Sequence, residues 1–178
     1  GGSLWAACES NGGLYRDGRE IVRDNRWCMG IAEHDGWVYS SHNNPECAIY
    51  RTRVADNHVE RCDVRGAGNR VARSIVVMDG KLYAPGFDYR KERGGCFVSD
   101  DDGKTFEWLD LIDGVRFLDS TVSEDRIWLA SSPYRGGKRV HPAGVYSWDG
   151  VGGVREELRT TDTRVGFSIT TTSDGTIH

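Results

Sequence analysis

Four segments of this chain repeat one pattern of residues, and this repeat constrains the fold more than any other feature. They begin at Arg26, Arg70, Arg116 and Arg164 and read RWCMGIAEHDGWVYSS, RVARSIVVMDGKLYAP, RFLDSTVSEDRIWLAS and RVGFSITTTSDGTIH. Each segment has Gly or Ser four residues after the arginine, then β-branched residues, a tight turn with aspartate and an apolar strand. The intervals are 44, 46 and 48 residues. A period of about 40 to 50 residues built only of short strands is typical of the blades of a β-propeller.

Two further strands follow in each unit, so that a unit contains four strands. The third strand is expected at residues 12–18, 47–52, 95–100 and 144–150, and the fourth at 19–23, 58–64, 106–111 and 154–158. The 23 glycines against four prolines suit many short strands joined by tight turns. No helical periodicity competes with this pattern over a useful length. The sequence therefore predicts an all-β fold of four-stranded antiparallel blades.

The two ends of the chain are expected to complete one blade together. Leu4 and Trp5 align with the second strand of the other units, while residues 165–172 match a first strand. Joining them would remove an exposed sheet edge, which otherwise invites aggregation. We therefore expect one domain, residues 1–178, with four blades, the last of which is completed by residues 1–25. The final letters GTIH slightly overlap this seam, so half of a two-chain ring and a part of a longer propeller are the alternatives.

The stretch SDDDGKTF, residues 99–106, lies at the turn from the third to the fourth strand of the unit that begins at Arg70. In such a turn an aspartate accepts backbone N–H groups, and a glycine adopts the positive φ that other residues resist. The aromatic residue then folds back as an apolar plug. Calcium binding is the alternative, but a calcium loop places its oxygen ligands at alternate positions, unlike three adjacent aspartates. We expect a structural turn, without metal, formed by Ser99, Asp101, Gly103, Thr105 and Phe106.

This turn resembles the Asp-box, or BNR repeat, of the sialidase-like propellers. Partial versions occur at the same turn of two other units, Arg16–Gly18 and Ser147–Gly150. The resemblance implies a propeller fold, an Asp-box face opposite the functional face, and a lean toward a secreted or cell-surface protein. It selects no function, because glycosidases, lectin-like binders and assembly proteins share such turns.

The arginines that open the four segments are the first candidate site. In a propeller the first strand of each blade begins near the central channel, so Arg26, Arg70, Arg116 and Arg164 are expected to ring its mouth. Guanidinium groups pair bidentately with carboxylate, sulfate or phosphate. The ring is similar to the arginine cluster with which sialidases hold the carboxylate of their substrate. The alternative is that these arginines tie blades together through acids such as Asp24, Asp113 and Asp162.

Long polar loops between second and third strands are the other candidate site. They cover residues 40–46, 84–95 and 130–143 and combine aromatic with charged side chains. Aromatic faces beside charged donors suit a sugar, an anionic glycan or a protein partner. The ligand-binding residues predicted there are His42, Asp88, Tyr89 and Tyr134. Merely solvated loops are the alternative.

Composition limits the classes of partner and cofactor. A net charge of −4 argues against nucleic-acid binding, and no apolar run approaches the about 18 residues of a membrane span. Five cysteines without a C-x-x-C pair signal neither a zinc site nor a full disulfide framework, so we expect structural thiols or one disulfide. We expect no metal and no cofactor, since ligand spacing is also lacking for His34, His42, His58 and His141.

These features favour a non-catalytic binding module that presents one loop face to a glycan, possibly anionic in character, or to a protein partner, as a monomer or homodimer. A sialidase-like glycoside hydrolase or lyase, or a part of one, is the alternative. Such an enzyme would need a tyrosine nucleophile with an acidic partner. Tyr89 and Tyr134 are available, but no local motif selects either, so no catalytic residue is assigned. An architectural assembly subunit is the third possibility.

Overall fold

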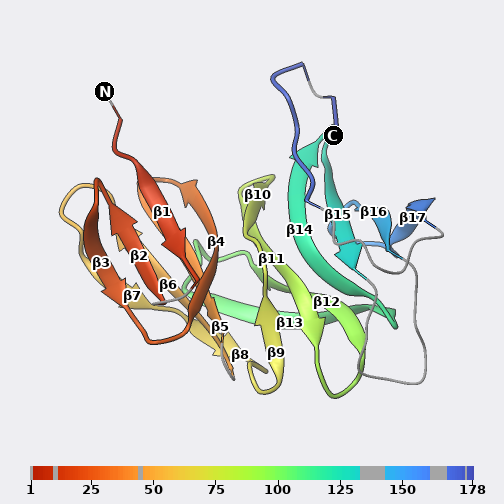
Figure 1. Cartoon of the computed structure of the whole chain (residues 1–178), viewed down its shortest axis with the longest axis horizontal. Coiled ribbons are helices and arrows are strands. Elements are labelled where there is room, and N and C mark those ends of the chain that lie inside the picture. The colour runs from red at the N-terminus through yellow and green to blue at the C-terminus, as the bar shows by residue number, and fades with distance from the viewer. Residues whose placement is uncertain (1, 10–11, 44–45, 133–142, 161–167, 175) are drawn as a thin grey trace.

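The computed structural model describes residues 2–9, 12–43, 46–132, 143–160, 168–174 and 176–178. Seventeen strands and no helix lie in these ranges, and the strands form four sheets (Figure 1). The all-β expectation is confirmed. None of the described segments forms a helix long and apolar enough to cross a membrane.

The first two sheets are meanders, in which each strand pairs with the next one along the chain. The first sheet contains β1 (Trp5–Cys8), β2 (Gly13–Arg16) and β3 (Arg19–Arg23). The second sheet contains β4 (Trp27–His34), β5 (Trp37–Asn43), β6 (Cys47–Arg53) and β7 (Val59–Arg61). The third and fourth strands expected for these units overlap β2, β3, β6 and β7.

The third sheet departs from the meander, whereas the fourth follows it. The third contains β8 (Asp63–Arg65), β9 (Arg70–Ala72), β10 (Val76–Met78), β11 (Lys81–Asp88), β12 (Arg93–Ser99) and β13 (Thr105–Asp113). The fourth contains β14 (Arg116–Ser123), β15 (Arg126–Ser132), β16 (Gly144–Trp148) and β17 (Arg155–Arg159). Strand β8 crosses from the second sheet to pair with β13, and this is the one parallel pairing among the described strands.

Two-residue turns join neighbouring strands in every sheet. Both turn residues have positive φ, as hairpins that match the twist of the strands require. Aspartate and glycine tolerate this conformation, which is why Asp-Gly marks most of these turns. The pairs are Asp17–Gly18, Asp35–Gly36, Asp79–Gly80 and Glu124–Asp125.

The core lies between consecutive sheets. Side chains of the second and third sheets form the first cluster, with Tyr39, Phe97 and Phe106 fully buried. A second cluster, between the third and fourth sheets, surrounds Phe117 and Trp148. All five cysteines are free thiols, and four of them are buried. Each sheet therefore buries its faces against its neighbours, not against a separate layer.

The first strand of each four-stranded unit is irregular close to its arginine. The pairing of β4 with β5 shifts between Cys28 and Gly30, and that of β14 with β15 shifts between Phe117 and Asp119. In the third sheet the first strand is divided into β9 and β10, opposite Pro85, which has no N–H group to donate. Such bulges bend a strand and redirect its side chains.

The C-terminal segment does not join the first sheet in the described part of the chain. Thr170 and His178 exchange two backbone hydrogen bonds, of 3.1 and 2.9 Å, so residues 170–178 pair with themselves. The described segment lies beside β14, where the Thr171 and Thr121 hydroxyl oxygens are 2.8 Å apart (Figure 1). Strand β1 pairs with β2 alone. The joining to the first sheet was expected for residues 165–172, and it is not formed by the described part, residues 168–172. The pairing that this part forms with residues 176–178 closes a much shorter loop.

Candidate anion-binding site

The turn that holds the three aspartates uses its polar groups internally. The Asp101 carboxylate accepts hydrogen bonds from the Ser99 hydroxyl and the Thr105 backbone N–H, both 2.9 Å long. The Ser99 hydroxyl in turn accepts the N–H of Gly103, whose φ is +72°. Burial opposes ionisation of Asp101, but these hydrogen bonds outweigh it and hold the pKa of Asp101 below its ordinary value. Phe106 is fully buried in the first core cluster.

Two of the four candidate arginines have acidic partners. Arg26 forms an ion pair with Asp24, at 2.5 Å, and the hydrogen bond from Arg26 to Asp24 raises the pKa of Arg26. Arg70 Nε lies 3.0 Å from the Asp88 carboxylate, and Asp88 is almost completely buried. The Arg70 guanidinium also lies over the ring of Trp108. Both charges are thus paired with a carboxylate of the protein, and the Arg70–Asp88 pair lies within one sheet.

Arg116 is placed differently from Arg26 and Arg70. It opens β14, and its guanidinium carbon lies 4.9 Å from the ring centre of Phe87 on β11. Its Nε is buried and has no hydrogen-bond partner. Within the described ranges no carboxylate pairs with it. Among the described residues, Arg116 therefore has no counter-charge in an ion pair.

Arg73, between β9 and β10, is a second arginine of this kind, and the sequence did not single it out. Its Nε is also buried without a hydrogen-bond partner, and its Nη1 contacts the sulfur of Met29 at 3.8 Å. Burial and, second, the positive charge of Arg116 lower the pKa of Arg73. The two guanidinium groups are thus close enough for their charges to interact. Both guanidinium groups have a buried Nε donor that is unused within the described residues.

Aromatic side chains lie beside these arginines. Phe87 is buried and contacts Arg116, while Tyr89 meets Phe87 edge to face, with ring centres 4.6 Å apart. Tyr89 is 44% exposed, and it also lies in the neighbourhood of Arg73. We call Arg73, Arg116, Phe87 and Tyr89 the two-arginine site. It combines a charged part with an exposed aromatic edge.

The remaining predicted site residues lie elsewhere. His42 is fully buried on β5, and burial lowers its pKa to about 4, so it is not available to a ligand from solvent. The Asp88 carboxylate accepts the backbone N–H groups of Arg90 and Lys91 in addition to pairing with Arg70. Tyr134 and Arg164 lie outside the described residues.

The sequence repeat gives no signal for Arg73. The repeat draws attention to residues that recur, and three positions after the arginine the units have Met29, Arg73 and Asp119. A position at which charge type differs between units carries no repeat signal. The break between β9 and β10 opposite Pro85 places Arg73 at an irregular point of the strand, and no periodicity predicts this.

A hollow of about 350 Å³ lies beside the Asp101 turn, but its one arginine is already paired. Arg65 in its wall forms ion pairs with Asp63 and Glu107, and the other charged groups of the wall are carboxylates, of which Asp101 is used by its own turn. The two-arginine site is therefore the better candidate for binding a charged ligand. No protein-family model and no curated protein matches this chain. Its candidate function rests on this geometry.

Proposed function

We propose that this chain is a β-propeller of the Asp-box type that acts as a non-catalytic binding module, and that its two-arginine site holds an anionic group of a glycan. The single observation that carries the binding proposal is the pair of neighbouring arginines whose buried Nε atoms have no acceptor. A carboxylate or sulfate would supply the missing acceptors.

The propeller is supported by contacts between successive first strands. A Cβ on Gly30 would lie 2.7 Å from the Cα of Ser74, and the Ser74 hydroxyl oxygen lies 2.7 Å from that of Ser120. All three residues stand four positions after the arginine of their unit. Equivalent positions of neighbouring units meet in this way when blades are arranged radially about one axis. The Asp101 turn, with its buried Phe106, supports the Asp-box resemblance.

The preference for an anion follows from the cost of leaving the two arginines as they are. A buried donor without an acceptor costs about 1 to 3 kcal/mol, and more when it is charged. Guanidinium matches the two oxygens of a carboxylate or sulfate, and such charge-assisted hydrogen bonds are stronger than neutral ones. Bound anion would also offset the repulsion between Arg73 and Arg116. These residues thus contribute more to binding than to folding.

The aromatic edge of the site favours a glycan over a free ion. Tyr89 offers an exposed ring with a polar tip, which packs against the C–H face of a sugar and hydrogen-bonds its hydroxyls. A uronate, a sialic acid or a sulfated sugar combines such a face with an anionic group. An acidic protein segment would satisfy the arginines but would make less use of the ring.

A sialidase-like hydrolase is a second candidate, favoured by the position of Tyr89. A tyrosine nucleophile needs an acidic partner and a substrate anchored by arginine. Tyr89 lies in the neighbourhood of Arg73, and the negative charges of two acids, Glu9 and Asp119, raise the pKa of the same arginine. Asp119 is already engaged by the Ser168 hydroxyl at 2.6 Å and by the Ile169 backbone N–H. Turnover of a fluorogenic sialoside or uronide that Tyr89→Phe abolishes would favour the enzyme over the binding module.

Titration calorimetry with glucuronate, N-acetylneuraminate and sulfate tests the binding proposal. The variants are Arg73→Met and Arg116→Lys, and Arg53→Lys is the matched control because Arg53 is exposed and already paired with Asp56. We expect both site variants to weaken binding about tenfold or more, which corresponds to the loss of a bidentate contact. The control variant should bind like the wild type.

The melting temperature separates a binding role from a structural one. Arg73→Met removes a desolvated cation that has no carboxylate partner, so the melting temperature without ligand should stay the same or rise. Anions should raise the melting temperature of the wild type by mass action and leave that of Arg73→Met unchanged. A fall in melting temperature in both site variants, with no response of the wild type to anions, would show that these arginines only hold the sheets together.

A further inference from the structure

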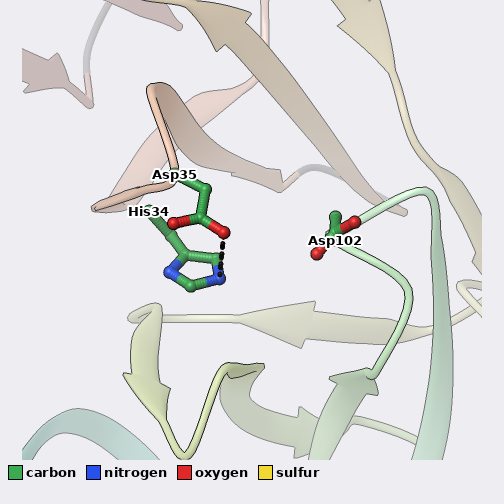
Figure 2. A group of neighbouring side chains, drawn as sticks. All are labelled: His34, Asp35 and Asp102. Carbon is green, nitrogen blue, oxygen red and sulfur yellow. Dashed lines mark ion pairs between the residues drawn. The ribbon is translucent and has the colours of Figure 1, made fainter.

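Three side chains with metal-binding atoms converge at the other end of β4 from Arg26. His34 ends β4, Asp35 lies in the turn between β4 and β5, and Asp102 lies in the turn between β12 and β13. One nitrogen or oxygen atom of each lies within 4.8 Å of those of the other two. Figure 2 shows the Asp35 carboxylate beside the His34 ring, at 3.7 Å from its Nε2, with Asp102 facing them from the other turn.

The backbone holds Asp102 in this place without any ligand. Its carbonyl oxygen accepts the Tyr39 hydroxyl at 2.8 Å and Nη1 of Arg51 at 2.9 Å. Tyr39 and Arg51 belong to β5 and β6, in the same sheet as His34. The turn of the third sheet is therefore fixed against the hairpin of the second. A site whose parts are positioned in advance loses less freedom when it binds.

No other structural role of these three side chains is seen in the described part of the chain. The turn between β12 and β13 uses the carboxylate of Asp101, which accepts from Ser99 and Thr105. In the part of the chain that the structure describes, the Asp102 carboxylate has no hydrogen bond or ion pair, and that of Asp35 contacts only His34. The nearby charge of Arg51 is met by its ion pair with Glu60. Two carboxylates and an imidazole are thus left to a ligand.

We propose that His34, Asp35 and Asp102 bind one divalent transition-metal ion, Zn²⁺ by preference. One imidazole nitrogen with two carboxylate oxygens suits zinc, whereas calcium takes six to eight oxygen ligands. Zinc bonds of about 2.0 to 2.2 Å place tetrahedral donors about 3.3 to 3.6 Å apart, so the His34–Asp35 pair is nearly in place. Both aspartates are exposed and can rotate toward the ion, and water completes the coordination.

The ion would join two turns that the chain itself does not connect. It would fasten the hairpin of the second sheet to the Asp101 turn of the third, and so clamp adjacent sheets at one face. This role is independent of the two-arginine site, which involves none of these residues. The sequence predicted no metal because the ligands come from separate turns and show no local spacing.

Calorimetric titration of the metal-free protein with zinc chloride tests the proposal. We expect one zinc ion per chain, and a raised melting temperature in excess zinc. Asp102→Asn and His34→Gln should each weaken binding about tenfold or more. Asp102→Asn should disturb the fold less than His34→Gln. Asparagine also tolerates the positive φ of position 102, and the Asp102 carboxylate makes no hydrogen bond or ion pair with the described residues. The matched control is His58→Gln, since His58 lies 3.3 Å from Glu60 but belongs to no three-donor group in the described residues.

Cobalt substitution distinguishes this site from binding by cysteine. Co²⁺ held by imidazole and carboxylate gives no thiolate charge-transfer band, whereas Co²⁺ on cysteine does. We expect no such band in the wild type and loss of the visible cobalt spectrum in Asp102→Asn. The proposal is overturned if millimolar zinc does not bind, if Asp102→Asn and His34→Gln bind like the wild type, if His58→Gln loses as much affinity, or if the band is present.

Discussion

The hydroxyl oxygens of Ser74 and Ser120 lie 2.7 Å apart, although the residues are 46 positions apart in the chain. Both side chains are buried, Ser74 ahead of β10 and Ser120 within β14. The contact joins the third sheet to the fourth directly, and neither serine belongs to the two core clusters. It occurs at the position where each unit has Gly or Ser. The close approach of neighbouring units there accounts for these small residues.

Substitution of these two serines should show that they act as a pair. Ser74→Ala or Ser120→Ala alone leaves one buried hydroxyl without its partner and should lower the free energy of unfolding by about 1 to 2 kcal/mol. The double variant should lose less than the sum of the two, with a coupling of about 1 kcal/mol. Urea unfolding of the four proteins measures this. Strict additivity would mean that the hydrogen bond contributes nothing.

Gly103→Ala should destabilise the protein for two reasons that a control can separate. The residue has a φ of +72°, and a Cβ there would lie 2.2 Å from Cε1 of the buried Tyr39. We expect a loss of about 3 kcal/mol, of which roughly 1 kcal/mol is backbone strain. Gly80 has the same φ of +72° but no atom within 4 Å of its Cβ position, so Gly80→Ala should show the strain alone. Equal losses in thermal unfolding would contradict the predicted clash with Tyr39.

Asp88→Asn should reveal what the ion pair with Arg70 contributes. The change keeps the shape and an acceptor for the backbone N–H groups of Arg90 and Lys91, but it leaves a largely buried guanidinium without its counter-charge. We expect a loss of about 2 kcal/mol in the free energy of unfolding. Asp56→Asn breaks the exposed pair with Arg53 and should have a much smaller effect. Similar effects in the two variants would indicate that the Arg70–Asp88 pair is as exposed to solvent as the Arg53–Asp56 pair.

The buried His42 should make the protein less stable in mild acid. Burial lowers the pKa of His42 from 6.5 to about 4, so the unfolded chain binds this proton at a higher pH than the folded protein. Stability is therefore full above pH 6.5 and falls as the pH drops toward 4, by about 2 to 3 kcal/mol at about pH 4.5. His42→Gln should remove this part of the pH dependence.

Urea unfolding at about pH 7.5 and about pH 4.5 measures the His42 effect, because carboxylates contribute mainly at lower pH. The comparison is between the pH-induced changes of the two proteins, so a general loss of stability in His42→Gln does not matter. The same pH-induced change in both would assign the acid sensitivity to other groups.

The strands could be predicted from the sequence because the local pattern and the fold agree. Asp35–Gly36 and Asp79–Gly80 mark turns by their own chemistry, and β5 and β11 follow these turns directly. The tolerance of aspartate and glycine for positive φ is a local property, so a single sequence carries it. The path of β8 is not local. Its partner β13 is chosen by where the next sheet lies, and nothing within residues 63–65 specifies a parallel neighbour.

The candidate sites were predicted less well, for a physical reason. Repetition identified the arginines but did not separate Arg26 and Arg70, which have acidic partners, from Arg116, for which the described residues supply none. That distinction depends on burial and on neighbours from other strands. Arg73 and the group of His34, Asp35 and Asp102 are assembled by contacts between sheets. Contacts between sheets leave no local pattern of residues in the sequence.

The parallel pairing of β8 with β13 has a consequence for how the protein folds. The N–H of Asp63 donates to the carbonyl of Lys104, and Arg65 reaches Glu107, which follows 42 residues later. At the ordinary pace of translation, the segment leaving the second sheet waits a few seconds before its partner has been made. Until then β8 has no partner strand, although the strands of the second sheet, β4 to β7, have all been made. Strands β8 and β13 should therefore open as one cooperative unit in native-state hydrogen exchange, with amide protection at residues 63–65 lost together with that of β13.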